Sequence, residues 1–166
     1  ISADQELSRL ISVFSLKRKI SGVVGTSLKS EIFMGTGVDA LAYEDLDTWN
    51  RLVKGDSLSQ HAESGVILGK TLAERLEVKP GDLVSLLVSS DRGRTNAIEL
   101  NVAGIQETGS KQLDAVALTI PISQVEKVME SNEVDSLVIG LHDTRLTTQA
   151  FEKLKKIVGN NLGKDL

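Results

Sequence analysis

The sequence contains no cysteine, which excludes disulfide bonds, thiol catalysis and thiolate metal sites. Aromatic residues make up only 3% of the chain, too few for the stacking platforms that bind single-stranded nucleic acid. No apolar run approaches the roughly 20 residues that a membrane-spanning helix needs. The longest run, Leu83 to Val88, is interrupted by Ser85 and has the length of a strand.

The residues that are present are those of an ordinary folded protein. The chain of 166 residues is 40% hydrophobic and 25% charged, which suits one packed core or two small lobes. Its net charge of -4 predicts no attraction to nucleic acid. No signal-peptide pattern opens the chain. The first residue is Ile1 rather than Met, which indicates a piece of a longer protein.

The first third of the chain predicts mixed elements. Apolar spacing at Leu7, Leu10, Ile11 and Phe14 predicts a helix from about Asp4 to Leu16. The basic run Lys17 to Lys19 is interpreted as its solvated end; contact with anionic lipid headgroups is the second interpretation. Strands are predicted over 20–24, 28–34 and 38–43, with a turn over 35–37. A short helix is predicted to begin at Asp45 or Asp47 and to end at Gly55. Its apolar residues are Trp49, Leu52 and Val53.

The middle and the end of the chain differ in their predicted order of strands and helices. A strand over 66–68, a helix over 71–76 and a Pro80-Gly81 turn lead into a hairpin, with strands over 83–88 and 97–105. From Ala115 the pattern changes to strand–helix–strand–helix, ending in a helix over about 147–158. We therefore expect an α+β fold, in which a β-rich small lobe (59–112) is inserted into an α/β lobe built from 1–58 and 113–166.

Two glycine-containing segments come close to nucleotide-binding motifs. Gly65 to Thr71 is one residue short of a P-loop, and its Val-Ile-Leu is strand material rather than a flexible phosphate cradle. Gly35 to Ala40 matches GxGxxA, but no long helix follows at once, as a dinucleotide site requires. We interpret the first segment as a strand that opens a helix and the second as a turn.

The sequence also lacks recognisable catalytic and metal-binding motifs. His61 and His142 lie far apart in the sequence, and neither has metal-ligand spacing. His142 is predicted to face solvent. There is no GxSxG or SxxK nucleophile motif. We therefore assign no catalytic, cofactor-binding or metal-binding residue. The acidic cluster around Asp45 is explained by a helix N-terminus.

The remaining candidate is the hairpin tip, residues 89–96, where Arg92 and Arg94 stand on an exposed loop. Guanidinium groups bind carboxylates in bidentate fashion, so these two residues are candidates for contact with a partner protein. The alternative, that they only keep the hairpin soluble, stays open.

The order of motifs over about 140 residues, from Ile20 to Asn161, resembles the extracytoplasmic core domain of MacB/LolC/FtsX-type ABC transporter permeases. No single piece is highly specific, and the order of the pieces carries the resemblance. The matching residues are Val66 to Gly69, Leu72-Ala73, Leu76, Pro80 to Asp82, Val102 to Ile105, Leu113-Asp114, Pro121 and Gln124-Val125.

The resemblance implies a porter-like α/β lobe with a small inserted lobe, and a mechanical, non-enzymatic role. It also implies an ABC ATPase on a separate subunit or domain, and a second permease copy or homologue. The exported substrate would be a lipoprotein or another molecule, and flanking segments would hold the domain at the outer side of the cell membrane. Members that recruit a periplasmic carrier use a long hook at the hairpin. Residues 89–96 are short and lack an apolar tip, which puts carrier recruitment in doubt.

A rival interpretation starts from Leu72-Ala73, Leu76 and Val78 to Val84, which also suit double-psi-type barrels such as the substrate-recognition domains of AAA ATPases. It would make the chain a cytosolic module that binds adaptors or substrates. The strand–helix–strand–helix ending argues against it, because a small barrel has no place for two such helices. An enzyme is the third and weakest interpretation.

Overall fold

The computed structural model describes residues 9–46, 50–90 and 92–162. Its contacts group into two units, which we call the ring unit (residues 15–138) and the terminal unit (residues 1–14 and 139–166). The predicted lobes, 1–58 with 113–166 and 59–112, divide the chain differently, and that division remains a prediction.

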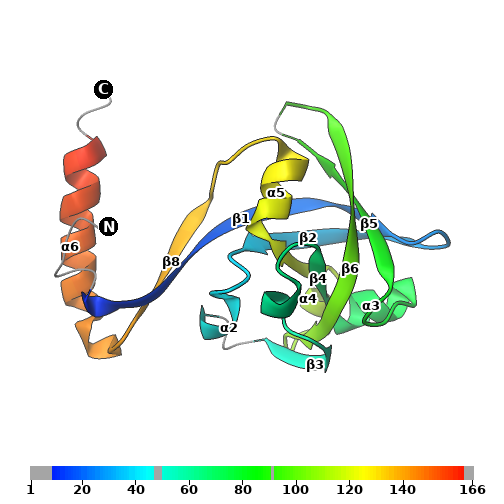
Figure 1. Cartoon of the computed structure of the whole chain (residues 1–166), viewed down its shortest axis with the longest axis horizontal. Coiled ribbons are helices and arrows are strands. Elements are labelled where there is room, and N and C mark those ends of the chain that lie inside the picture. The colour runs from blue at the N-terminus through cyan, green and yellow to red at the C-terminus, as the bar shows by residue number, and fades with distance from the viewer. Residues whose placement is uncertain (1–8, 47–49, 91, 163–166) are drawn as a thin grey trace. The chain divides into compact units, whose positions relative to one another are not determined.

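Six strands of the ring unit pair into a closed ring (Figure 1). The strands are β1 (Ile11–Gly25), β2 (Ser30–Val38), β4 (Gly65–Gly69), β5 (Leu83–Ser89), β6 (Thr95–Glu107) and β7 (Ala117–Pro121). Around the ring, β1 pairs with β2, β2 with β7, β7 with β4, β4 with β6, β6 with β5, and β5 with β1. The β2–β7 and β4–β6 pairs are parallel and the others antiparallel. A further strand, β3 (Arg51–Gly55), pairs with β6 outside the ring.

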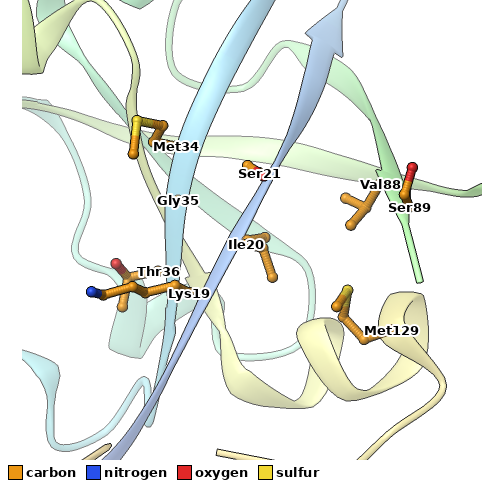
Figure 2. A pocket seen from close by; sticks show the side chains of 9 residues that line it. All are labelled: Lys19, Ile20, Ser21, Met34, Gly35, Thr36, Val88, Ser89 and Met129. Carbon is orange, nitrogen blue, oxygen red and sulfur yellow. The ribbon is translucent and has the colours of Figure 1, made fainter. Parts of the chain in front are cut away.

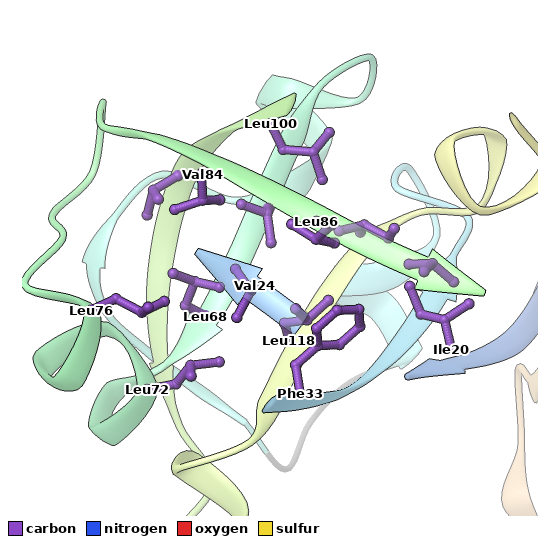
Figure 3. Close-up of a cluster of buried hydrophobic side chains, with 14 of the residues drawn as sticks. Ile20, Val24, Phe33, Leu68, Leu72, Leu76, Val84, Leu86, Leu100 and Leu118 are labelled. Atoms are coloured by element: carbon purple, nitrogen blue, oxygen red, sulfur yellow. The ribbon is translucent and has the colours of Figure 1, made fainter. Parts of the chain in front are cut away.

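The ring closes around one apolar core (Figure 3). Because successive strand residues point to opposite faces, every second residue of β5 is buried and its neighbours are exposed. Each fully buried large aliphatic side chain stabilises the fold by about 1.5–3 kcal/mol. The strands contribute Ile20, Val24, Phe33, Val66, Leu68, Val84, Leu86, Val88, Leu100, Val102, Ile105, Leu118 and Ile120.

Two helices cover opposite ends of the ring. Helix α3 (Lys70–Leu76) buries Leu72 and Leu76 in the core, and α5 (Ile122–Met129) buries Val125 and Val128. Arg75 of α3 lies 3.6 Å from Glu31, at the start of β2. Val125 of α5 instead packs against Gly37, near the end of the same strand. The shorter helices are α2 (Tyr43–Leu46), η1 (Leu58–His61) and α4 (Lys111–Asp114).

The terminal unit is built from the ends of two strands and one long helix. Strand β8 (Ser136–Leu141) is the neighbour of β1 in the strand order. It leads through η2 (Thr144–Leu146) to α6 (Thr147–Leu162). The backbone amide of His142 donates to the carbonyl of Leu10 over 3.1 Å. The strand–helix–strand–helix ending predicted from Ala115 is confirmed by β7, α5, β8 and α6.

The α+β fold class is confirmed, and the middle of the chain matches the prediction most closely. Strand β4, helix α3 and the β5–β6 hairpin occupy the predicted positions. At the Pro80-Gly81 turn, Gly81 has φ +95, the left-handed conformation that glycine adopts readily. The segment 56–64 has a polar sequence, yet it contains η1 and the fully buried Leu58.

The predicted helix over Asp4 to Leu16 is wrong from Ile11 onward, because Ile11 to Leu16 belong to β1. Arg9 and Leu10 are helical, and residues 4–8 lie outside the described ranges. Residues 11, 13 and 15 share the inward face of this strand, and Ser15 among them is polar, whereas the apolar Phe14 points outward, so apolar spacing alone suggested a helix. The basic run Lys17 to Lys19 is therefore not a helix end. It lies within β1, and Arg18 is only 4% exposed.

The predictions for residues 35–55 also need correction. Gly35 and Gly37 lie within β2 and not in a turn. A Cβ at Gly37 would come 2.3 Å from Val125 Cγ2, and one at Gly35 would come 2.6 Å from Leu118 Cδ1. These glycines therefore permit close packing. The predicted strand over 38–43 and helix through Leu52 are likewise wrong, because α2 begins at Tyr43 and 51–55 form β3. Asp47 and Trp49 lie outside the described ranges.

Candidate functional site

The hairpin tip between β5 and β6 is a tight, internally bonded turn. The amide of Ser90 donates to the carbonyl of Arg94 over 2.7 Å, and the amide of Arg94 donates to Ser90 Oγ over 3.2 Å. Gly93 supplies φ +74 at the apex. Asp91 lies outside the described ranges. The tip is thus a short, defined projection rather than a long hook.

The two predicted contact residues have different surroundings. Arg94 forms an ion pair with Glu130, the residue that follows α5, although its side chain remains 60% exposed. Asn96 adds a 2.8 Å hydrogen bond from Nδ2 to the carbonyl of Val128. Arg94 therefore fastens the hairpin to α5. Arg92 is exposed, and its side chain forms no hydrogen bond or ion pair with the residues that the structure describes. Of the two, Arg92 has its guanidinium available for a carboxylate.

A groove of about 410 Å³ opens beside β1 and β2, where these strands meet the ends of β5 and α5 (Figure 2). Its lining mixes hydroxyl groups, apolar side chains and one lysine, and it includes both methionines of the chain. The lining residues are Lys19, Ile20, Ser21, Met34, Gly35, Thr36, Val88, Ser89 and Met129.

The outer face of the ring carries a continuous apolar row. In β2, β1, β5 and β6, residues Ile32, Val23, Leu87 and Ala97 are paired directly with one another in register. All four are exposed, Ile32 by 68%. Single exposed apolar residues are common on protein surfaces, whereas an ordered row across four strands is less common.

The near-miss P-loop folds as interpreted, into strand β4 followed by α3. Lys70 lies 3.2 Å from Glu107, which also binds Arg51 over 2.8 Å. Hydrogen bonds from Arg51 and then Lys70, together with the charge of Lys70, hold the pKa of the Glu107 carboxyl below its ordinary value of 4.5. Lys70 thus takes part in a surface ion-pair network.

The two histidines belong to different units. His61 Nε2 lies 3.5 Å from Asp56 Oδ2 in the ring unit. His142 is exposed, as predicted, and belongs to the terminal unit. Among residues 9–46, 50–90 and 92–162, no group of three His, Asp or Glu side chains could hold a metal ion. Over the same residues, no helix is both long and apolar enough to cross a membrane.

No protein-family model matches the sequence. The fold, however, is similar to that of solved extracytoplasmic domains. The extracellular domain of the ABC-type transporter YknZ from Gram-positive bacteria matches with a TM-score of 0.70 and 13% identity, over 95% of this chain and 81% of that one. The periplasmic region of MacB from Actinobacillus actinomycetemcomitans matches with a TM-score of 0.67 and 17% identity, over 95% and 73%.

This chain has the fold of the MacB-type periplasmic domain. A domain of a permease protein from Porphyromonas gingivalis is also similar, with a TM-score of 0.56 and 14% identity over 93% of this chain and 68% of that one. The structural resemblance expected from the order of motifs is thereby confirmed. A MacB-type fold does not itself assign a substrate, since folds host many functions.

The sequence analysis did not predict that Asp114 and Arg18, two polar residues of the ring unit, are buried. Asp114 is 3% exposed, and its Oδ1 accepts hydrogen bonds from the amide and the hydroxyl of Thr108, over 2.8 and 2.7 Å. Arg18 donates from Nη1 to the carbonyl of Ser131 over 2.8 Å, across 113 positions of sequence. No local pattern marks a partner so distant. The six-residue spacing of Thr108 and Asp114 is local and could have been noticed.

Proposed function

We propose that this chain is the extracytoplasmic domain of an ABC transporter permease. The observation that supports this most strongly is the match over 95% of the chain to the extracellular domain of YknZ, with a TM-score of 0.70. In this role the chain catalyses no reaction. It transmits motion driven by an ABC ATPase on a separate subunit or domain, working with a second permease copy or homologue.

We extend the proposal to the cargo and the location. The domain lies outside the cell membrane and contacts an exported substrate or partner proteins, in a system of the lipoprotein-release or efflux type. The short hairpin tip, fastened to α5 through Arg94 and Asn96, offers no long hook. This favours a system that does not recruit a carrier through this hairpin.

The test is the sequence of the parent gene on both sides of this chain. We expect apolar runs of about 20 residues near each end, the length that crosses a bilayer. Purification of the parent protein with its ATPase subunit or domain would then identify the complex. Polar flanks on both sides would contradict the proposal.

Those flanks would instead favour the rival module that binds adaptors or substrates. One observation supports this rival: the six strands close into a ring. The two C-terminal helices do not exclude a barrel, because α5 covers an end of the ring and α6 belongs to the terminal unit.

Within the permease, we propose that Arg92 contacts a carboxylate of a partner protein and that Arg94 presents it by fixing the hairpin. A photo-reactive amino acid at position 92 of the full-length permease should yield a cross-link to another protein in native membranes, to be identified by mass spectrometry. The same probe at Glu99, exposed on the neighbouring strand β6, is the control. Equal yields at positions 92 and 99 would refute a contact specific to Arg92.

A further inference from the structure

A second cavity opens in the ring unit, where α2, β3 and η1 lie next to β4 and β6. Its volume is about 380 Å³, within the range of pockets that hold small ligands. All of its lining residues belong to the ring unit. Three lining side chains are carboxamides, those of Asn50, Gln60 and Gln106, and we therefore call this cavity the amide pocket.

The amide pocket contains a buried carboxamide with unused donors. Gln106 of β6 is 4% exposed, and its Oε1 accepts a 2.8 Å hydrogen bond from the hydroxyl of Tyr43. Its Nε2 forms no hydrogen bond with the residues that the structure describes. Among those same residues, no fully buried side-chain nitrogen or oxygen lacks a partner. Gln106 Nε2 therefore reaches the open space of the pocket, where its two N–H groups can donate to a ligand.

The position of Gln106 on β6 makes this carboxamide unusual. Neighbouring residues of a strand point to opposite faces, so Ile105 joins the main core while Gln106 enters the amide pocket. An apolar side chain could fill a buried position without any hydrogen bond. A carboxamide left with unused donors is costly there unless something accepts from it. Gln106 thus indicates a position that is completed by a ligand with an oxygen acceptor.

The charge of the lining restricts the kind of ligand. Asp56 is the only charged residue among the lining residues, and its side chain is 61% exposed, at the rim. The lining residues include no lysine or arginine. An anion would therefore meet a carboxylate with no cation in the lining to offset the repulsion, whereas a neutral or cationic molecule would not.

The other lining groups favour a peptide. A carboxamide presents a donor and an acceptor side by side, as the peptide group does, so the two can pair. Ile67 and Leu52 add apolar surface that suits an aliphatic side chain. Tyr43 is the only aromatic residue of the lining, and it is 9% exposed. It therefore leaves no open ring face on which a planar base could stack.

We propose that the amide pocket binds a short peptide segment that is neutral or positively charged. A carbonyl oxygen of the peptide accepts from Gln106 Nε2, and an aliphatic side chain packs against Ile67 and Leu52. An amino group or N–H of the peptide faces Asp56. The site lies wholly within the ring unit and needs neither an ATPase nor a second copy, so it can fail while the permease assignment stands, and the reverse.

The first test is a titration of the 166-residue chain followed by NMR. The probe is the cationic dipeptide alanyl-leucinamide, and N-acetyl-alanyl-leucine is an anion of similar size. The cation should bind with a dissociation constant of about 1 mM and shift the side-chain amide signals of Gln106. The anion should bind about tenfold more weakly, because Asp56 repels it. Equal binding of the two, or no saturable shift with either, would overturn the proposal.

Two substitutions separate the parts of the site. Asp56→Asn should weaken binding of alanyl-leucinamide about two- to fivefold and leave the uncharged N-acetyl-alanyl-leucinamide unaffected. Gln106→Met, similar in volume but without donors, should weaken both ligands about three- to tenfold. Glu133→Gln, an exposed change outside the lining, is the control.

Gln106→Met also removes the acceptor of the Tyr43 hydroxyl, so its thermal midpoint is measured before any titration. If this variant does not fold, Asp56→Asn still decides the question, because its side chain is exposed. An unchanged affinity for the cation in Asp56→Asn, or an equal loss for the charged and uncharged ligands, would contradict the proposal.

A third test distinguishes a free peptide from a segment of another protein. A photo-reactive amino acid replaces Gln60, which is exposed at the rim, in the full-length parent protein within its own cells. The control position is Gln112, an exposed glutamine outside the lining. An adduct above the control level supports the site, and its mass, that of a peptide or of a protein, identifies the source. Equal yields at positions 60 and 112 would refute the proposed site.

Discussion

The ring unit and the terminal unit differ in how many of their side chains are buried. The ring unit closes six strands on themselves and fills the interior with aliphatic side chains and Phe33. In the terminal unit, Ala150 is the only buried side chain among residues 9–14 and 139–156. Phe151, on the same helix, is 60% exposed.

The difference indicates where the free energy of folding resides. A helix of 16 residues is marginal in water without a packed face, so α6 contributes little by itself. In the ring, each of the six strands pairs with a neighbour on both sides, and the interior is filled by buried side chains. A part with little stability of its own is suited to move, whereas a closed, packed part is suited to respond as a body.

Truncating the core should have the largest effect on this comparison. Leu86 is completely buried, so Leu86→Ala should lower the free energy of unfolding by about 2–5 kcal/mol through lost burial and the cavity left behind. The matched change in the terminal unit, Phe151→Ala, should shift it by no more than about 0.5 kcal/mol. Urea unfolding followed by circular dichroism measures both. Similar losses from the two variants would break the comparison.

Closure of the ring can be tested at Gly22, where β1 passes close to β5. A Cβ there would lie 2.1 Å from the carbonyl oxygen of Leu87. We expect Gly22→Ala to cost about 1–3 kcal/mol, because a backbone atom cannot move aside as a side chain can. Ser21→Ala, on the exposed face of the same strand, is the control. If Gly22→Ala matches the control in its urea midpoint, the β1–β5 approach is looser than described.

Separating the two units should have a smaller effect. A fragment of residues 15–138 should unfold cooperatively, with a loss of about 1 kcal/mol, the scale of one or two hydrogen bonds. A peptide of residues 139–166 should show little helix by circular dichroism. A fragment 15–138 that fails to fold would show that the terminal unit supports the ring.

The smallest effect should come from the ion pairs that attach β3 and α3 to Glu107. The pKa of the Glu107 carboxyl is lower in the folded protein than its ordinary value of 4.5. The ionised carboxylate therefore stabilises the fold at pH values above 4.5. That contribution is lost as the pH falls through the folded pKa. Glu107→Gln should therefore lower the thermal midpoint slightly at pH 7 and leave it unchanged near pH 2. An equal decrease at both values would exclude an electrostatic origin.

The sequence predicted the segments whose signals are local. The alternation over 83–88, the Pro80-Gly81 turn and the helix after Gly69 depend on neighbours in the chain, and they occur where expected. The resemblance to permease domains drew on the same segments, which explains why the fold was found despite 17% identity or less.

The errors occur where distant residues decide the structure. Gly35 and Gly37 looked like a turn, but their close neighbours Leu118 and Val125 lie more than 80 positions later. Residues 51–55 become a strand only because β6 is beside them. Of the candidate site, the sequence found an exposed Arg92. It could not show that Arg94 is paired with Glu130, since that contact depends on α5.

The closed ring also sets an order in which the chain can fold during synthesis. The β1–β2 hairpin can form as soon as both strands have been synthesised. The other partner of β2 is β7, so Met34 cannot pair with that strand until Ala117 has been synthesised. Such distant pairings fold slowly, in milliseconds to seconds. Until the ribosome has delivered residue 121, one edge of β2 remains open to other chains. A chaperone that occupies Ser30–Val38 would therefore protect the domain most during its synthesis and become unnecessary once β7 has paired.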